Sequence, residues 1–123
     1  MKNRQSLFLW FGAALILIIG LIHVIDAPDS FEEAAYKGWL FYANGLGALV
    51  AAFGIFYKRN WGWNLGLFIA AASIVLYIAS RSIGLPLIPA EPDAWFEPIG
   101  VASFAAEALF ISLYILVRRK HEN

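Results

Sequence analysis

The 123-residue sequence contains no cysteine. This absence excludes disulfides, thiolate-bound metals, iron–sulfur clusters and cysteine nucleophiles. Methionine occurs only at Met1, so a thioether copper site is not expected. The two histidines are His23 and His121, and the second belongs to a charged tail, which disfavours a bis-histidine haem within one chain. The sequence therefore predicts no metal and no other cofactor.

Charged residues are also scarce, at 15% of the chain, whereas hydrophobic residues make up 61%. A soluble domain averages about 45–50% apolar residues, and so small a globule could not bury this excess. Four apolar runs account for it, and each is long enough to span a hydrocarbon core of about 30 Å. We predict a single domain, residues 1–123, in the all-α integral membrane class, folded as an antiparallel bundle of four transmembrane helices. The predicted spans are residues 6–25, 38–57, 61–85 and 95–117.

The net charge is zero, but the basic residues gather on one predicted side of the membrane. Four spans place both termini and the connection at residues 58–60 on that side. Because cytoplasmic segments carry an excess of lysine and arginine, we expect both termini in the cytoplasm and a multi-pass location in the cell (inner) membrane. No pattern indicates nucleic-acid binding, so the lipid bilayer is the expected partner. The basic residues on this side are Lys2, Arg4, Lys58, Arg59, Arg118, Arg119 and Lys120.

Local signals suggest where the helices begin and end. Ser30 and Glu33 have the spacing of a capping box, so the second helix is expected to begin near Phe31. The prolines between Leu85 and Trp95 prevent a helix there, and Asp93 is expected to cap the fourth helix.

Small residues recur along one face of each predicted helix, as in the G-x-x-x-G pair Gly62 and Gly66. Such residues let helix backbones approach closely in membranes. Packing within the chain is the first interpretation. Homo-oligomerisation, or assembly into a larger membrane complex, is the alternative.

Polar side chains inside the spans are the main functional signal, because a charge at a helix centre costs about 2.5–3.5 kcal/mol on insertion scales. Counted from the predicted outer helix ends at about 1.5 Å per residue, His23 and Arg81 lie roughly 5 Å deep and Glu107 roughly 16 Å deep. All the ionisable residues within the spans fall in the outer half. We therefore expect a polar pocket that opens outward and is closed below. Its predicted ligand- or ion-binding residues are His23, Asn44, Tyr77, Arg81, Glu97 and Glu107.

The roles of these residues stay open at this point. Arg81 either pairs with Glu97 and pins the third helix to the fourth, or holds the pocket mouth. Glu107 has no basic residue at its expected depth, so it is either protonated and hydrogen-bonded, or ionised to bind a proton, metal or cationic ligand. The protonated form has three candidate partners: Asn44, Tyr77 and Ser103.

Two motifs resemble those of a family of small, uncharacterised prokaryotic four-helix membrane proteins. R-x-x-G-L-P at residues 81–86, followed by W-x-E-P-x-G at residues 95–100, is similar to the family's signature. Residues 23–34 resemble its H-x-x-x-A-P-E-H-F-x-E-A segment, although Ser30 replaces a frequent histidine and Leu87 a usual glycine. The resemblance implies four spans and the importance of His23, Arg81 and Glu97, but it implies no activity. The missing histidine further disfavours a metal.

The function expected from the sequence is that of a small membrane protein whose outward-facing pocket binds a small ligand, an ion or a lipid headgroup, or that acts as an accessory subunit. One alternative is a proton- or cation-coupled transporter or channel that uses Glu107. Another is a membrane enzyme that uses His23 and a carboxylate, but no catalytic residue can be assigned and the sequence favours a protein without enzymatic activity.

Overall fold

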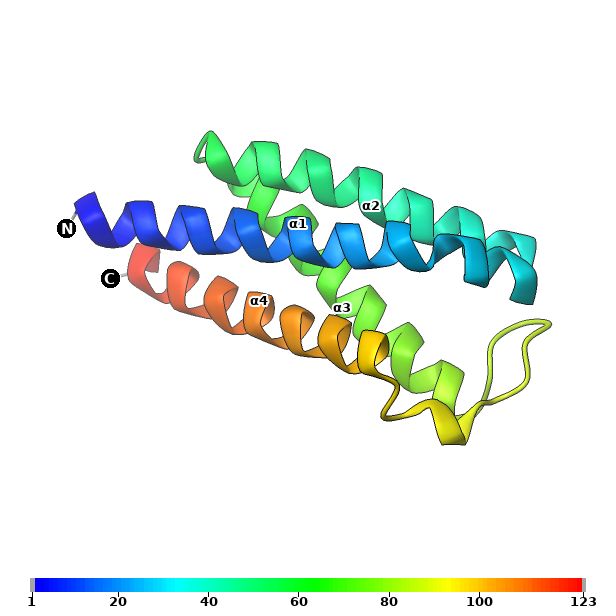
Figure 1. Ribbon diagram of the computed structural model, residues 1–123. Coiled ribbons are helices and arrows are strands. Elements are labelled where there is room, and N and C mark those ends of the chain that lie inside the picture. The colour runs from blue at the N-terminus through cyan, green and yellow to red at the C-terminus, as the bar shows by residue number, and fades with distance from the viewer. Residues whose placement is uncertain (1, 123) are drawn as a thin grey trace.

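The computed structural model describes the backbone of residues 2–122 and the side chains of residues 6–119. The side chains of Lys2, Arg4, Lys120 and His121, which enter the predictions above, lie outside this range. The described residues form four α-helices, all long and apolar enough to cross a membrane, so the prediction of an all-α chain with four such helices is confirmed. The helices are α1 (Lys2–Glu33), α2 (Ala35–Phe56), α3 (Asn60–Ser82) and α4 (Pro98–Glu122), with a 3₁₀-helix η1 (Pro92–Ala94) before α4 (Figure 1).

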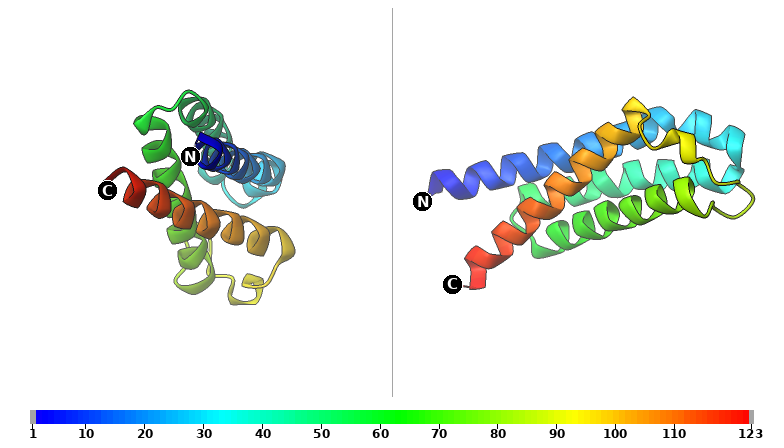
Figure 2. Two further views of the ribbon diagram at one scale, coloured as in Figure 1. Left: turned by 90° about the vertical axis from the view of Figure 1, so that its left-hand side faces the viewer. Right: turned by 90° about the horizontal axis from the view of Figure 1, so that it is seen from below.

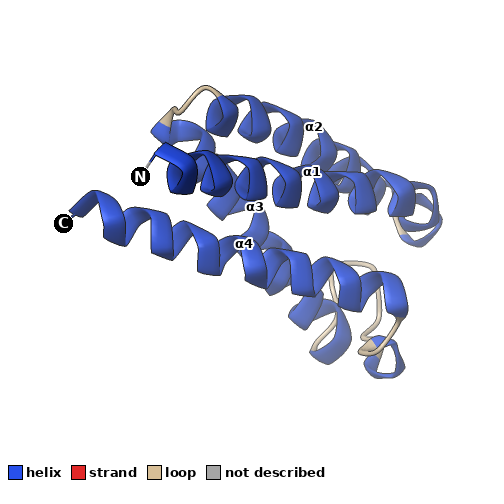
Figure 3. Ribbon diagram, turned by 60° about the vertical axis from the view of Figure 1, so that its left-hand side comes forward, coloured by secondary structure: helices blue, strands red, loops and turns tan. Residues whose placement is uncertain are grey.

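The helices pack as two hairpins side by side. α1 contacts α2 and α4, and α3 also contacts α2 and α4. Figure 2 shows the bundle along its length, and Figure 3 shows that the loops are confined to its two ends. We call the end where α1 begins and α4 finishes the terminal end, and the opposite end, which carries residues 83–97, the loop end (Figure 1).

α1 is longer than the sequence indicates. It continues past residue 25 to Glu33, and a single extended residue, Ala34, separates it from α2. The predicted outer loop and the helix start near Phe31 are therefore wrong. Ser30 does not cap a helix, because its hydroxyl donates to the Asp26 carbonyl 3.1 Å away inside α1.

A proline explains this error in physical terms. Pro28 lies inside α1, and an internal proline removes one backbone hydrogen bond and strains the preceding turn. The helix continues here because the segment packs against its neighbour. Ser30 is buried, and the Phe31 ring lies where a side chain on Gly38 of α2 would be.

The connection between α2 and α3, predicted at residues 58–60, is a tight turn. Lys58 adopts a left-handed conformation with φ of 62°. The Arg59 N–H donates to the Gly54 carbonyl at 2.8 Å, and the Lys58 N–H donates to the Ile55 carbonyl at 3.0 Å. This pair of bonds is the Schellman motif, which satisfies carbonyls at a helix C-terminus.

The helix ends beside residues 83–97 differ from the predicted ones by a few residues. α3 stops at Ser82, and Gly84 with φ of +90° turns the chain away, a conformation that favours glycine. α4 begins at Pro98, where the missing N–H costs little. Asp93 lies within η1, so the prediction that it caps α4 is wrong.

The apolar core fills the terminal half of the bundle. Trp63 stacks on Phe110, with ring centroids 5.7 Å apart, and both side chains are buried. Gly12 leaves room for the Trp63 ring, and Gly66 leaves room for Phe110. Both large rings thus fit between the helices because the facing residues have no side chain, which supports the interpretation of the small residues as packing positions within the chain.

α2 and α3 approach each other closely where Gly54 meets Gly62. A Cβ on Gly62 would meet the backbone of Gly54 and Ile55, which cannot yield without moving a helix. A Cβ on Gly47, also in α2, would meet only the flexible end of Ile69, 3.1 Å away. Close contact of α2 with α3 therefore depends on Gly62 far more than on Gly47.

We predict that Gly62→Ala lowers the free energy of unfolding by about 1–3 kcal/mol, the usual cost of overpacking. Gly47→Ala is the matched control and should lose clearly less. Thermal unfolding of both variants in one detergent measures the difference. Equal losses would show that the Gly54–Gly62 crossing is not a tight constraint.

Candidate functional site

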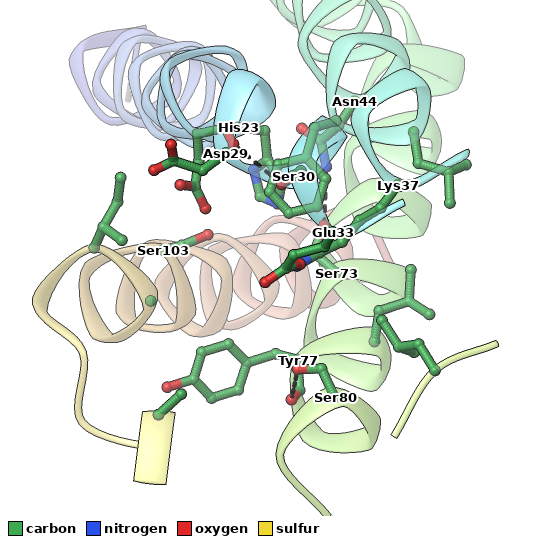
Figure 4. Close-up of a pocket in the computed structure, with 18 of the residues that line it drawn as sticks. His23, Asp29, Ser30, Glu33, Lys37, Asn44, Ser73, Tyr77, Ser80 and Ser103 are labelled. Carbon is green, nitrogen blue, oxygen red and sulfur yellow. Dashed lines mark hydrogen bonds and ion pairs between the residues drawn. The ribbon is translucent and has the colours of Figure 1, made fainter. Parts of the chain in front are cut away.

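A cavity of about 500 Å³ lies in the loop half of the bundle. Its lining comes from all four α-helices and from residues 83–97, and Figure 4 shows part of it. The lining runs from exposed residues such as Asp29 and Glu97 to Glu107, which is 1% exposed. The cavity brings together all six residues predicted from the sequence: His23, Asn44, Tyr77, Arg81, Glu97 and Glu107.

Four polar residues lie at one depth in the cavity and form what we call the polar layer: His23, Asn44, Ser73 and Glu107. Each is about nine or ten residues from the end of its helix at the loop end, which corresponds to roughly 14–15 Å. The shallow position predicted for His23 is therefore wrong. The error follows from the length of α1, which adds two turns of helix above this residue.

Two side chains lie close to the Glu107 carboxyl: His23 within the polar layer and Ser103 one helical turn above it. The Ser103 hydroxyl donates to its Oε2 at 2.7 Å, and His23 Nε2 lies 3.9 Å from the same oxygen. Of the three candidate partners, Ser103 is confirmed, whereas Asn44 and Tyr77 bond elsewhere. The expectation that no basic residue lies at the depth of Glu107 is wrong, because the imidazole of His23 is there.

The tautomer of His23 follows from its backbone contact. Its Nδ1 lies 2.8 Å from the Ile19 carbonyl, which can only accept, so Nδ1 carries a hydrogen and donates. Nε2 is then the only ring nitrogen that can gain or lose a proton, and it faces Glu107. The ring of Phe41 packs against the imidazole, with centroids 4.9 Å apart.

Asn44 joins α2 to α3, as expected for a polar residue between membrane helices. Its Nδ2 donates to the Ser73 hydroxyl at 3.0 Å, and that hydroxyl donates to the Ile69 carbonyl at 2.7 Å. The Asn44 Oδ1 is buried and has no hydrogen-bond partner. Buried polar atoms are nearly always satisfied in folded proteins, so this oxygen is an unused acceptor on a residue that lines the cavity.

Arg81 at the mouth does not make the predicted ion pair with Glu97. Its guanidinium Cζ lies 3.9 Å from the centroid of the Tyr77 ring. Its nitrogens donate to the Ser80 hydroxyl at 2.7 Å and to the Ala94 carbonyl at 3.3 Å. Among the described side chains, the one pairing of a lysine or arginine with a carboxylate is that of Lys37 with Glu33. Arg81 instead secures the loop before α4 through the Ala94 carbonyl.

Other polar residues of the cavity were not predicted, and helical periodicity could have found several of them. Had α1 been extended beyond residue 25, the spacing of His23, Asp26, Ser30 and Glu33 would have placed them on one helix face. Tyr36 also lines the mouth, where its hydroxyl donates to the Pro86 carbonyl at 2.6 Å and links α2 to the loop.

The described side chains include no group of three or more histidine, cysteine, aspartate or glutamate residues that could hold a metal ion. Comparison of the chain with protein-family models, curated proteins and solved structures gives no match. Fold and site together define a four-helix protein of membrane-spanning length, with a polar cavity in one half and an apolar core in the other.

We predict that Arg81→Ala and Glu97→Ala have different effects on stability. Arg81→Ala should lower the free energy of unfolding by about 1–3 kcal/mol, because it removes a cation–π contact and charged hydrogen bonds. Glu97→Ala should change it by less than about 0.5 kcal/mol, as for an exposed side chain without such contacts. Thermal unfolding of the two single variants and the double variant checks this. Similar, non-additive losses would instead indicate that the two residues pair.

Proposed function

We propose that the chain is a small multi-spanning protein of the cell (inner) membrane, with both termini in the cytoplasm, whose cavity binds a small ligand from the outer side. The lengths of the four helices support the spans, and the concentration of lysine and arginine near the termini supports the orientation. In this orientation the loop end faces outward. The resemblance to small prokaryotic four-helix membrane proteins agrees with the proposal but adds no activity.

The observation that carries this proposal is that packed side chains close the floor of the cavity. A volume of about 500 Å³ lies within the range of about 300–1,000 Å³ that is usual for small-molecule sites. Below the polar layer, Phe110, Ile16 and Ile19 are fully buried and Trp63 stacks across the bundle. A cavity that ends on packed side chains suits binding, whereas a transport path in one protomer would need an exit through this core.

The buried polar groups support a binding role for the cavity. An ionisable side chain at the depth of Glu107 costs free energy in a membrane, and intramembrane acids usually serve a function. The unpartnered Asn44 Oδ1 is a second group that a purely structural interface would have satisfied. Both residues line the same cavity.

The chain contains no native cysteine, so single cysteines can report access to the cavity. We predict that a small, membrane-impermeant thiol reagent added outside modifies Ser103→Cys, which lines the cavity, but not Ser112→Cys, which is exposed on the outer surface of α4 and would face lipid. Mass spectrometry of protein from intact cells measures the modification. Modification of Ser103→Cys from the cytoplasmic side only would refute the outward orientation.

Ligand binding itself can be tested on the unmodified chain in lipid nanodiscs. We predict that a panel of small organic cations, anions and neutral polar molecules contains at least one class that raises the melting temperature. A ligand at 100 times its Kd stabilises the folded state by about 2.7 kcal/mol. The absence of any shift across all three classes would contradict a ligand-binding cavity.

A further inference from the structure

We propose that the polar layer binds the primary ammonium group of a small organic cation and that one proton leaves the layer as the cation enters. This inference rests on the proposed ligand-binding cavity and names the class of ligand that it takes. Three observations carry it: the unused acceptors of the layer, the one buried carboxyl among the described side chains, and the charge at the mouth.

The polar layer offers acceptors and few free donors. His23 Nδ1–H is used by the Ile19 carbonyl, so its Nε2 faces the cavity as an acceptor when the ring is neutral. The Ser103 hydroxyl donates to Glu107, and the Ser73 hydroxyl donates within its own helix. The hydrogens of these groups are thus already used, and their lone pairs, together with the unpartnered oxygen of Asn44, remain as acceptors. A primary ammonium supplies three hydrogens.

The carboxyl of Glu107 requires a positive partner at this depth. A lone carboxylate out of water carries a penalty of several kcal/mol, so either a proton or a cation must accompany it. Lys37 is engaged by Glu33, and the Arg81 guanidinium lies on the Tyr77 ring, so neither serves as its counter-ion. His23 and Glu107, 3.9 Å apart, are therefore the groups that hold a proton between them when the cavity has no ligand.

The mouth of the cavity favours entry of cations. Carboxylates outnumber cationic groups in its lining, and a cleft lined by one sign of charge concentrates ions of the opposite sign. The rings of Phe41 and Tyr77 also line the cavity and can pack against the apolar body of an organic cation, while Lys37 and Arg81 already occupy cation–π positions on them. The other charged groups in the cavity lining are Asp26, Asp29 and Glu33 on α1, Lys37 on α2, Arg81 on α3, Glu91 in the loop, and Glu97 before α4.

The exchange balances in charge and in protons. In the empty cavity, His23 and Glu107 hold one proton between them. The ligand enters as R–NH₃⁺, that proton departs to water through the mouth, and the ammonium hydrogens bond to Glu107, His23 Nε2 and the Asn44 oxygen. The total charge of the layer is the same before and after. Because protons compete with the ligand, amine binding should weaken about tenfold for each pH unit of acidification over the range in which the pair is protonated.

Isothermal titration calorimetry of the full chain in nanodiscs tests the proposal, with benzylamine as the probe and benzyl alcohol and benzoate as its neutral and anionic counterparts. We expect benzylamine to bind at least about tenfold more tightly than either counterpart. The binding heat measured in buffers of different ionisation enthalpy should report the release of about one proton per amine. Glu107→Gln should abolish both the preference and the proton release, whereas Glu32→Gln, which removes an exposed charge outside the cavity lining, should keep both.

Several results would overturn the proposal. Benzyl alcohol or benzoate binding as tightly as benzylamine would exclude an ammonium site while leaving a ligand-binding cavity in place. Benzylamine binding without proton release would exclude the exchange. No binding of benzylamine would exclude both parts, and the thermal-shift panel would then decide whether the cavity binds anything. The preference and the proton release are measured on the unmodified chain, so the test does not depend on the folding of Glu107→Gln.

Discussion

The carboxyl of Glu107 constrains the rest of the cavity. It is 1% exposed and lies about 14 Å from the loop end of α4, where water is scarce if the helices span a bilayer. A carboxyl group in such a place must be hydrogen-bonded and either neutral or accompanied by a cation. Ser103 supplies the hydrogen bond and His23 the nearest basic group. His23 reaches this depth because α1 continues to Glu33, and Ser103 lies one helical turn before Glu107 in α4.

The two halves of the bundle differ because their packing differs. In the terminal half, glycines opposite Trp63 and Phe110 let the helices close around large rings. In the loop half, polar side chains meet across the same helices, and the remaining space is the cavity. The interactions of Arg81 and Tyr36 with carbonyls of residues 83–97 hold the loop at the rim of this space. The apolar core of the terminal half thus forms the floor of the cavity, and residues 83–97 lie at its mouth.

Much of the fold could be predicted from the sequence, because a run of about 20 apolar residues has few folded alternatives to a membrane-spanning helix. The six cavity residues could also be predicted, since polar groups in such helices gather away from lipid. The end of α1 could not, because Pro28 and the acidic residues around it are typical of a loop, and only their packing against α2 keeps them helical. The partner of Arg81 depends on the backbone path of the loop, for which the local sequence has no periodic pattern.

In our proposal, the floor of the cavity holds a cation beside Glu107. The most direct test is a structure of the protein in lipid with 4-bromobenzylamine, whose bromine marks the orientation of the ligand. We expect the ammonium nitrogen within hydrogen-bond distance of Glu107 and the Asn44 oxygen, with the bromine toward the mouth. A bromine at the floor, with the ammonium among the carboxylates of the mouth, would contradict it.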